Sequence, residues 1–226
     1  METSTLTGAV GLLDGGVVVA DSRLNLAMTH SERLLLAVDQ LLTTARWRLD
    51  DVDGLAVAVG PGSFTGLRIG ISTVKGLALA TGKPLVGIST LDALAWSLPF
   101  AGVPLCPILN ARKGEVYGGL YRTEGGRLLR LSGHRAVAPT QLAEEIREMG
   151  LGPVVFLGDG VAPFREPIRD VLGPDAWFAP PGYRLPSATS LGELALAAFA
   201  RGEAADPATL VPVYVRAPEA ELARRA

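Results

Sequence analysis

The sequence predicts an α/β fold made of two copies of a β-β-β-α-β-α unit, with the first strand of the first copy missing. Two glycine turns, Gly15-Gly16 and Gly125-Gly126, lie 110 positions apart, and each separates two apolar runs. After each pair of runs the elements follow in one order: a helix, a short buried strand and a tight glycine loop. Because the two halves share negligible sequence identity, the duplication is inferred from this order alone.

The first half begins with a hairpin. Thr7–Leu13 and Val17–Arg23 are apolar runs, and the glycines after Asp14 supply the positive φ that a tight turn needs. Ser31 is the expected N-cap of a helix that runs to Leu49. The remaining elements are a strand at Leu55–Val59, a loop at Gly60–Gly66, a helix at Thr65–Thr81, a strand at Leu85–Ser89 and a helix at Thr90–Leu98.

The second half repeats this plan with an extra strand in front. Pro104–Leu109 reads as a strand that precedes the second hairpin, whereas only Met1-Glu2-Thr3-Ser4 precedes the first, and Glu2 falls where Asn110 falls. A lost strand would leave buried backbone groups unpaired. We therefore expect the natural gene to encode roughly six residues before Met1. The other elements are strands at Val116–Arg122, Arg127–Leu131 and Val154–Leu157, helices at Pro139–Met149 and Leu191–Ala200, and a tight loop at Gly158-Asp159-Gly160.

Composition narrows the class of protein. The 226 residues are 48% hydrophobic with a mean hydropathy of +0.31, which predicts a well-filled core in two subdomains, 1–102 and 103–226. The net charge of −2 gives no general sign of a nucleic-acid-binding surface. One cysteine, Cys106, allows no intrachain disulfide. No secretion signal and no apolar run long enough to cross a membrane is visible, so we expect a cytoplasmic protein with no membrane contact.

The loop between the first buried strand and its helix is rich in glycine. It consists of Gly60, Pro61, Gly62, Ser63, Phe64, Thr65 and Gly66. A loop in this position can cradle a phosphate at a helix N-terminus. However, the spacing fits neither the P-loop, which ends in Gly-Lys-Ser/Thr, nor the dinucleotide fingerprint. The favoured interpretation is a rigid turn that lets a glycine-rich helix pack closely.

Two helices carry features of a partner-binding surface. On the helix Ser31–Leu49, Leu36 and Trp47 line up opposite the core stripe, with Gln40 and Thr43 beside them. Scattered surface residues are the alternative interpretation. The expected core stripe is Leu34, Leu35, Val38, Leu41, Leu42, Ala45 and Leu49.

The helix Thr65–Thr81 has small residues on one face and two charges, Arg68 and Lys75, on the opposite side. Glycines destabilise a helix by roughly 1 kcal/mol each, so three of them need a packing reason. A core contact and a partner contact are about equally supported. The small face is Gly66, Gly70, Thr73, Gly76 and Ala80.

No catalytic constellation is visible. The two histidines, His30 and His134, lie in different halves, and neither belongs to a His-x-x-x-His or Glu-x-x-His pair. No Gly-x-Ser-x-Gly elbow occurs. The sequence therefore predicts no catalytic residue and no metal ligand.

One long run resembles a known family. GPGSFTGLRIGISTVKGLALATGKPLVGISTLDALA, from Gly60 to Ala95, closely resembles the TsaB (YeaZ) family. Asn110–Tyr117 is similar to the family's Asp-Ala-Arg-x-x-Glu-Val-Tyr segment, with Asn110 in place of the aspartate. Leu210–Arg216 is similar to its Pro-x-Tyr-x-Arg ending, and the loop Gly158-Asp159-Gly160 also fits.

The resemblance implies an actin-like, sugar-kinase-like fold (the ASKHA or ribonuclease H-like class) of two duplicated halves. It implies a non-catalytic scaffold that binds TsaD, the paralogous transferase, with a TsaE-type ATPase in the larger complex. The complex modifies adenosine 37 in tRNAs that read ANN codons, and this subunit meets tRNA only indirectly. In TsaD-type sequences two histidines bind a metal, and here Thr90 and Leu94 fill their positions. No cofactor is expected; a nucleotide at the partner interface and a homodimer of the isolated chain are left open.

Another function of the same fold is the main alternative, since fold alone does not settle function. An active ATPase or kinase would need a catalytic carboxylate and Mg²⁺ ligands. Glu2 and Asp159 are the only candidates near strand ends. The absent first strand and the absent histidines favour the scaffold, and the missing ligands also disfavour a protease.

Overall fold

The computed structural model describes residues 1–25 and 30–215, which divide into two compact units. Unit 1 contains Met1–Ala93 and Pro186–Val213, and unit 2 contains Leu94–Leu185 with Tyr214 and Val215. This division differs from the expected boundary after residue 102. The chain leaves unit 2 at Pro186 and returns to unit 1, where its last helix packs on the first sheet.

Unit 1 holds two strand pairs joined by the start of the chain. β1 (Thr7–Asp14) and β2 (Val17–Asn25) are antiparallel, and β3 (Leu55–Gly60) and β4 (Leu85–Ser89) are parallel. Glu2 pairs with Ala9 of β1. The Met1 nitrogen donates to the Ala56 carbonyl at 2.7 Å, and the Ala58 N–H donates to the Met1 carbonyl at 3.0 Å. Met1 and Glu2 therefore lie between β1 and β3 and bond to both.

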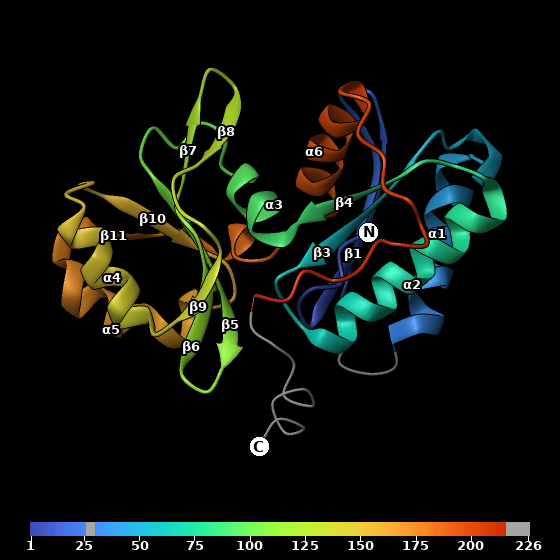
Figure 1. Ribbon diagram of the computed structural model, residues 1–226. Helices are drawn as coiled ribbons and strands as arrows, with labels where there is room; N and C mark the ends of the chain where they lie inside the picture. The colour runs from blue at the N-terminus through green and yellow to red at the C-terminus, as the bar shows by residue number, and fades with distance from the viewer. Residues whose placement is uncertain (26–29, 216–226) are drawn as a thin grey trace. The chain divides into compact units, whose positions relative to one another are not determined.

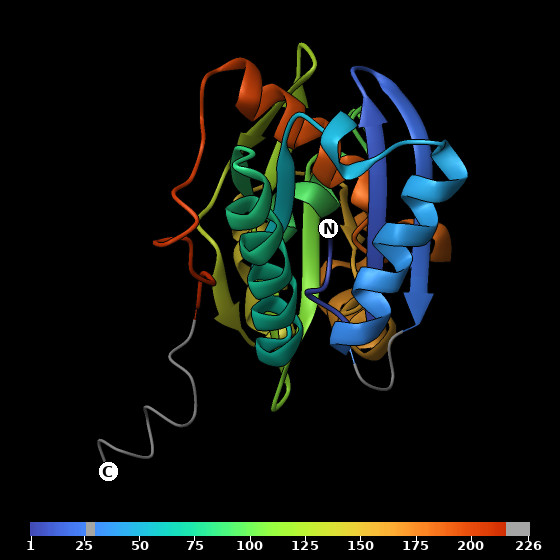
Figure 2. The ribbon, with the colours of Figure 1, turned by 90° about the vertical axis from the view of Figure 1, so that its right-hand side faces the viewer.

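Helices cover both faces of this sheet. α1 (His30–Ala45) and α2 (Phe64–Thr81) lie side by side on one face, and α6 (Ala188–Ala200) covers the other (Figures 1 and 2). The buried residues between α2 and the sheet include Val57, Ile71, Val74, Ala78 and Leu85. Those under α6 include Ala58, Val86, Leu191, Ala195 and Ala198.

Helix α1 is shorter than expected. It ends at Ala45, and Arg46 adopts a left-handed conformation with φ of 59°. Leu49 therefore belongs to a short 3₁₀ turn, η1 (Leu49–Asp51), and not to the helix. The predicted core stripe is also wrong at Leu35, which is 49% exposed, because the helix buries Leu34, Ala37 and Leu41 against β1.

Unit 2 is built on a longer sheet with the order β11-β10-β5-β6-β9. Its central strand, β5, runs antiparallel to β6 and parallel to β10. A hairpin of β7 and β8 extends from β5. The strands are β5 (Leu105–Arg112), β6 (Glu115–Gly118), β7 (Tyr121–Glu124), β8 (Arg127–Arg130), β9 (Arg135–Val137), β10 (Val154–Leu157) and β11 (Ala176–Phe178).

Two helices, α4 (Pro139–Glu148) and α5 (Val161–Leu172), pack on each other and close the core of unit 2. The short helix α3 (Thr90–Trp96) connects β4 to the segment that leads into β5. Two 3₁₀ turns, η2 (Gly173–Asp175) and η3 (Pro181–Tyr183), follow α5. In the part of the chain that the structure describes, no helix is long and apolar enough to span a bilayer.

The strand order supports the predicted duplication. Unit 1 reads β2-β1-(Met1–Glu2)-β3-β4, and unit 2 reads β9-β6-β5-β10-β11, with the same strand directions. The predicted second hairpin exists as β7–β8, but it is an insertion. Its first strand was expected to run from Val116 to Arg122 and instead breaks between β6 and β7. The counterpart of β1–β2 is therefore β6–β9.

Candidate partner-binding surface

Helices α1 and α2 lie side by side (Figure 2), and we call their outer side the α1/α2 surface. Several of its apolar side chains face solvent: Leu36 is 58% exposed and Leu79 is 72% exposed. Within the segments 34–45 and 64–81, the exposed residues are Leu35, Leu36, Asp39, Gln40, Thr43, Thr44, Phe64, Thr65, Arg68, Ser72, Gly76, Leu79 and Ala80.

Over residues 34–45 and 64–81, this surface carries few charges. Asp39 and Arg68 are its exposed charged residues, and the Arg68 guanidinium lies over the Phe64 ring at 4.0 Å from the centroid. The corresponding helices of unit 2 differ sharply. Their exposed residues include Glu144, Arg147, Glu148, Glu166 and Asp170. Since the core of a protein interface is depleted in charged residues and the two helix pairs have the same place in the duplicated fold, the α1/α2 surface is the one suited to a protein partner.

The structure places four of the six predicted interface residues on this surface. Leu36, Gln40, Thr43 and Arg68 are exposed there. Sequence reasoning missed Leu35 and Leu79. Leu79 could have been found from the helical spacing of Ser72, Gly76 and Leu79, which face away from buried residues.

Lys75 is a correction. Its ammonium donates to the carbonyl of Leu210 at 3.1 Å and to that of Ala208 at 3.3 Å. The segment that carries these carbonyls also pairs with the sheet, where Ala205 N–H donates to Leu85 and Val213 N–H donates to Val59. Lys75 therefore ties the end of unit 1 to α2.

Trp47 is also a correction. Because α1 ends before it, Trp47 does not continue the outward row of Leu36. Its backbone N–H donates to the Leu42 carbonyl at 2.9 Å, and its half-buried ring lines a partly open apolar pocket of unit 1. The ring therefore belongs to the packing of unit 1.

The glycine loop holds the chain's own N-terminal segment. Ser63 N–H donates to the Ser4 carbonyl at 2.6 Å, and a Cβ on Gly62 would lie 2.7 Å from Ser4 Cβ. A Cβ on Gly66 would collide with the Thr3 carbonyl. Ser63 Oγ caps α2 by accepting from Gly66 N–H at 3.3 Å. These contacts support the rigid-turn interpretation of the loop, since Thr3 and Ser4 fill the space beside its glycines.

The small face of α2 divides in two. Gly66 and Gly70 are buried against Thr3, whereas a Cβ on Gly76 would meet no atom within 4 Å, and Gly76 faces solvent with Ala80. The first pair serves close packing within unit 1. The second pair belongs to the α1/α2 surface.

The two carboxylates considered for a kinase lie in different units. Glu2 is fully buried, and burial raises its pKa above the ordinary value, although the Ser4 N–H donates to its carboxylate. Asp159 accepts from Asn110 N–H at 2.8 Å, and burial raises its pKa as well. The Asn110 contact gives Asp159 a structural role at the end of β5.

The positions that the resemblance equates with metal-binding histidines are buried. Thr90 begins α3, Leu94 follows one turn later, and both are 0% exposed. Over residues 1–25 and 30–215, no three His, Cys, Asp or Glu side chains converge as metal ligands would. Neither a threonine hydroxyl nor a leucine can replace an imidazole ligand.

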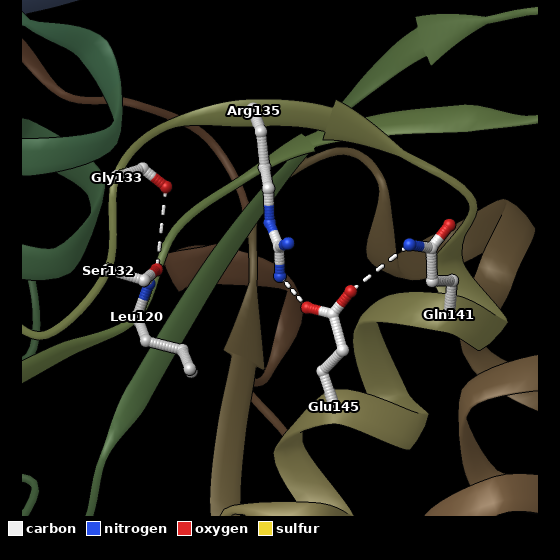
Figure 3. Close-up of polar contacts among 6 residues, drawn as sticks. All are labelled: Leu120, Ser132, Gly133, Arg135, Gln141 and Glu145. Carbon is white, nitrogen blue, oxygen red and sulfur yellow. Dashed lines mark hydrogen bonds and ion pairs between the residues drawn. The ribbon is translucent and has the colours of Figure 1, made fainter.

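A hollow in unit 2 is lined by residues that include Arg135, Glu145 and Glu148. Arg135 and Gln141 both contact the Glu145 carboxylate, and Leu120 N–H donates to Ser132 Oγ at 2.9 Å (Figure 3). The buried Tyr121 hydroxyl contacts His134. These contacts fix the β8–β9 connection against α4.

Comparison with known proteins identifies the class and then the family. The profile of the tRNA N6-adenosine threonylcarbamoyltransferase family (TsaD) matches residues 19–224. The glucomannokinase of Arthrobacter sp. strain KM superposes with a TM-score of 0.53 at 13% identity over 85% of this chain and 95% of that one, which shows the fold alone. The fold is thus actin-like and sugar-kinase-like, with a threonylcarbamoyltransferase-type domain.

The chain belongs to the TsaB family. It is 34% identical to the tRNA threonylcarbamoyladenosine biosynthesis protein TsaB of Bacillus subtilis (strain 168), over 98% of this chain and 94% of that protein. It is 32% identical to TsaB of Escherichia coli (strain K12), over 96% and 93%. The solved structure of YeaZ from Pseudomonas aeruginosa superposes with a TM-score of 0.81 at 31% identity, over 94% and 96%.

Proposed function

We propose that this protein takes part in the biosynthesis of threonylcarbamoyladenosine in tRNA as a non-catalytic subunit. It binds a TsaD-type transferase, its paralogue, through the α1/α2 surface and supports that enzyme. The pathway comes from the names of its TsaB relatives, which match over nearly their whole lengths. Work on tRNA is consistent with a cytoplasmic location.

The observation that carries the partner role is the contrast between the two duplicated helix pairs. Exposed leucines and small residues dominate α1 and α2, whereas glutamates, aspartate and arginine dominate the exposed residues of α4 and α5. Two structurally equivalent faces would have similar surfaces if both only met water. An apolar face rich in small residues suits the close approach of another helix pair, and a paralogue of the same fold offers such a pair.

The residues at the positions of the transferase's metal ligands support a non-catalytic role. Thr90 and Leu94 stand where the transferase pattern has metal-binding histidines, and both are 0% exposed. The chain's own Thr3 and Ser4 fill the space beside the glycine loop. The kinase alternative rests on the fold and on two carboxylates in separate units, so no specific observation favours it.

The test is a titration of the chain against its cognate TsaD-type protein. Leu36→Asp should weaken the complex at least about tenfold, because it removes a leucine that the partner would bury and inserts a charge there. The variant should also lose any stimulation of the transferase. Its own melting temperature should stay near that of the parent, since Leu36 is 58% exposed before binding.

Two control variants sharpen this test. Leu129→Asp alters a comparably accessible leucine on β8 of unit 2, 40% exposed, and should leave affinity unchanged. Trp47→Ala should lower the melting temperature while affinity changes little, because its half-buried ring lines an apolar pocket of unit 1. Parental affinity for Leu36→Asp would refute the proposed surface, and transfer activity by the isolated chain would refute the non-catalytic role.

A further inference from the structure

The two units differ in how the edges of their sheets are protected. The ends of the unit 2 order, β9 and β11, have three residues each, and the hairpin strand β8 has four. At one end of the unit 1 sheet, β4 is partly covered, since Ala205 N–H donates to the Leu85 carbonyl. At the other end, β2 has nine residues and pairs with β1 alone among the described strands. Because short or covered edges keep a sheet from pairing with another chain, the edge of β2 is the unprotected one.

The alternation of hydrogen bonds along β1 shows which backbone groups of β2 face outward. Ala9 exchanges both of its backbone hydrogen bonds with Glu2, so these groups are turned away from β2. Ala9 lies opposite Arg23, and Gly11 lies opposite Asp21. In an antiparallel ladder such pairs are not hydrogen-bonded to each other, and their N–H and C=O groups point to the outer sides. The backbone groups of Asp21 and Arg23 are therefore presented along the free edge.

The side chains of Asp21 and Arg23 lie on the α6 side of the sheet and are exposed. A Cβ on Gly11, opposite Asp21, would meet Ala188 of α6 at 3.1 Å, whereas Ala20 packs on the α1 side. Among the described residues, neither the carboxylate of Asp21 nor the guanidinium of Arg23 has an ion-pair or hydrogen-bond partner. The edge thus carries two unpaired charges of opposite sign on one face.

These charges select one way in which the edge can pair with itself. A two-fold axis at Ser22 would place Asp21 of each copy opposite Arg23 of the other, and each such pair could exchange two backbone hydrogen bonds. An axis one residue away, at Asp21 or at Arg23, would place like charges opposite each other. An axis between two residues would set outward groups against groups already bonded to β1. The axis at Ser22 alone satisfies both hydrogen bonding and charge.

The segment around Ser22 is regular enough to pair. The bulge in the β1–β2 ladder lies between Leu12 and Leu13, toward the turn, and the register is unbroken for the β2 residues 20–25. The strand contains no proline and begins with three exposed valines. Valine favours extended backbone, and the absence of proline leaves every N–H of the strand able to donate.

We propose that the free edge of β2 is a site of self-association, where a second copy of this chain adds its own β2 in antiparallel orientation about a two-fold axis at Ser22. About four backbone hydrogen bonds join the copies, with an Asp21–Arg23 ion pair on each side of the axis. A contact of this size is small, so the dimer forms with a dissociation constant of roughly 10–100 µM. The edge is the rim of the unit 1 sheet and does not include the exposed residues of the α1/α2 surface, so this contact is independent of the proposed partner.

Charge-reversal variants test the pairing by sedimentation velocity. Asp21→Lys and Arg23→Glu should each weaken the dimer at least about tenfold, because like charges then lie opposite each other on both sides of the axis. An equimolar mixture of the two variants should associate about as tightly as the parent, since each charge then meets its opposite. Leu36→Asp, on the α1/α2 surface, is the control and should leave the dimer unchanged. All three variants should melt near the parent temperature, since the substituted side chains are exposed.

A cysteine at the axis locates the contact. Residues on the axis would form a non-hydrogen-bonded pair with Cα atoms about 4.5 Å apart, within the range of a disulfide. Ser22→Cys should therefore give a disulfide-linked dimer under mild oxidation, whereas Ser72→Cys, exposed on α2, should not. The native Cys106 is fully buried and does not compete.

Several results would overturn the proposal. A chain that stays monomeric at about 0.5 mM would show that the edge does not self-associate. A mixture that associates no more tightly than either charge variant alone would show that Asp21 and Arg23 do not set the pairing. Loss of the dimer in Leu36→Asp, or cross-linking of Ser72→Cys as fast as Ser22→Cys, would place the contact on the α1/α2 surface instead.

Discussion

At the scale of single residues, a chain that begins at Met1 holds a buried amine whose proton is linked to folding. Burial lowers the pKa of the Met1 amine from 8.0 to about 6. Between these values the unfolded chain keeps a proton that the folded chain has lost, so stability should rise from pH 6 to pH 8 and level off above. The expected gain is about 2–3 kcal/mol, measured by denaturant unfolding across this range.

The neighbouring carboxyl acts in the opposite direction. Burial raises the pKa of Glu2, so the folded state holds its proton longer than the unfolded state, and its contribution falls as pH rises past the ordinary range of a glutamate. Acetylation of the Met1 nitrogen separates the two effects, since it removes only the amine. Parallel stability curves for the free and acetylated chains between pH 6 and pH 8 would contradict the linkage.

Single residues also show where sequence reasoning reaches its limit. Leu36, Gln40, Thr43 and Arg68 were placed correctly on the surface because helical spacing alone decides which way they face. Trp47 was expected on the helix, but α1 ends at Ala45, four positions before the expected end at Leu49, because Arg46 is left-handed. The contact of Lys75 joins residues 133 and 135 positions apart, which no local pattern reports.

At the scale of elements, the glycines of α2 give a matched pair of substitutions. Gly66→Ala should destabilise unit 1 by about 2 kcal/mol, because the added Cβ collides with the Thr3 backbone, which cannot rotate away as a side chain could. Gly76→Ala should stabilise the protein by about 0.5–1 kcal/mol, because its Cβ meets open space in a helix interior. Thermal and denaturant melting of both variants measures the difference.

The opposite signs are the informative feature of this pair. If both substitutions stabilise, the glycines serve only as weak helix residues, and the close approach of Thr3 to α2 is incorrect. If both destabilise, the outer face of α2 is packed in the free protein and is not available to a partner.

Elements with clear periodicity or turn chemistry could be predicted from the sequence, and those with mixed signals could not. β3, α2 and β4 appear at nearly the expected residues because buried strands alternate with a capped, glycine-terminated helix. α5 was missed although Val161, Phe164 and Ile168 have helical spacing, because Pro167 lies inside it. β9 and β11 have three residues each, too short for a two-residue alternation to stand out.

At the scale of the whole molecule, the repeated sheet order is the feature that both the sequence and the structure carry. Gly158 and Gly160 are packed against Ile108 of the central strand β5, as Gly62 and Gly66 are packed against Ser4 and Thr3. The predicted family and fold are confirmed by the comparisons. Helix α6 follows unit 2 in the chain but packs on unit 1. This could not be predicted, since it depends on contacts between segments about a hundred or more residues apart.

The charge pattern of the molecule leads to a final prediction about how it associates. Asp39 and Arg68, one of each sign, are the exposed charges on residues 34–45 and 64–81, so screening by salt should have little to act on at this surface. Affinity for the cognate TsaD-type protein should therefore change by less than about threefold between roughly 0.05 and 0.5 M NaCl.

Lys75→Glu should leave this weak dependence unaltered and lower the melting temperature instead, because it replaces a donor to Ala208 and Leu210 with an acceptor. A steep loss of affinity with salt would show that charges outside the α1/α2 surface hold the complex together. Titration of the parent and of Lys75→Glu at both salt concentrations, with melting in parallel, distinguishes these outcomes.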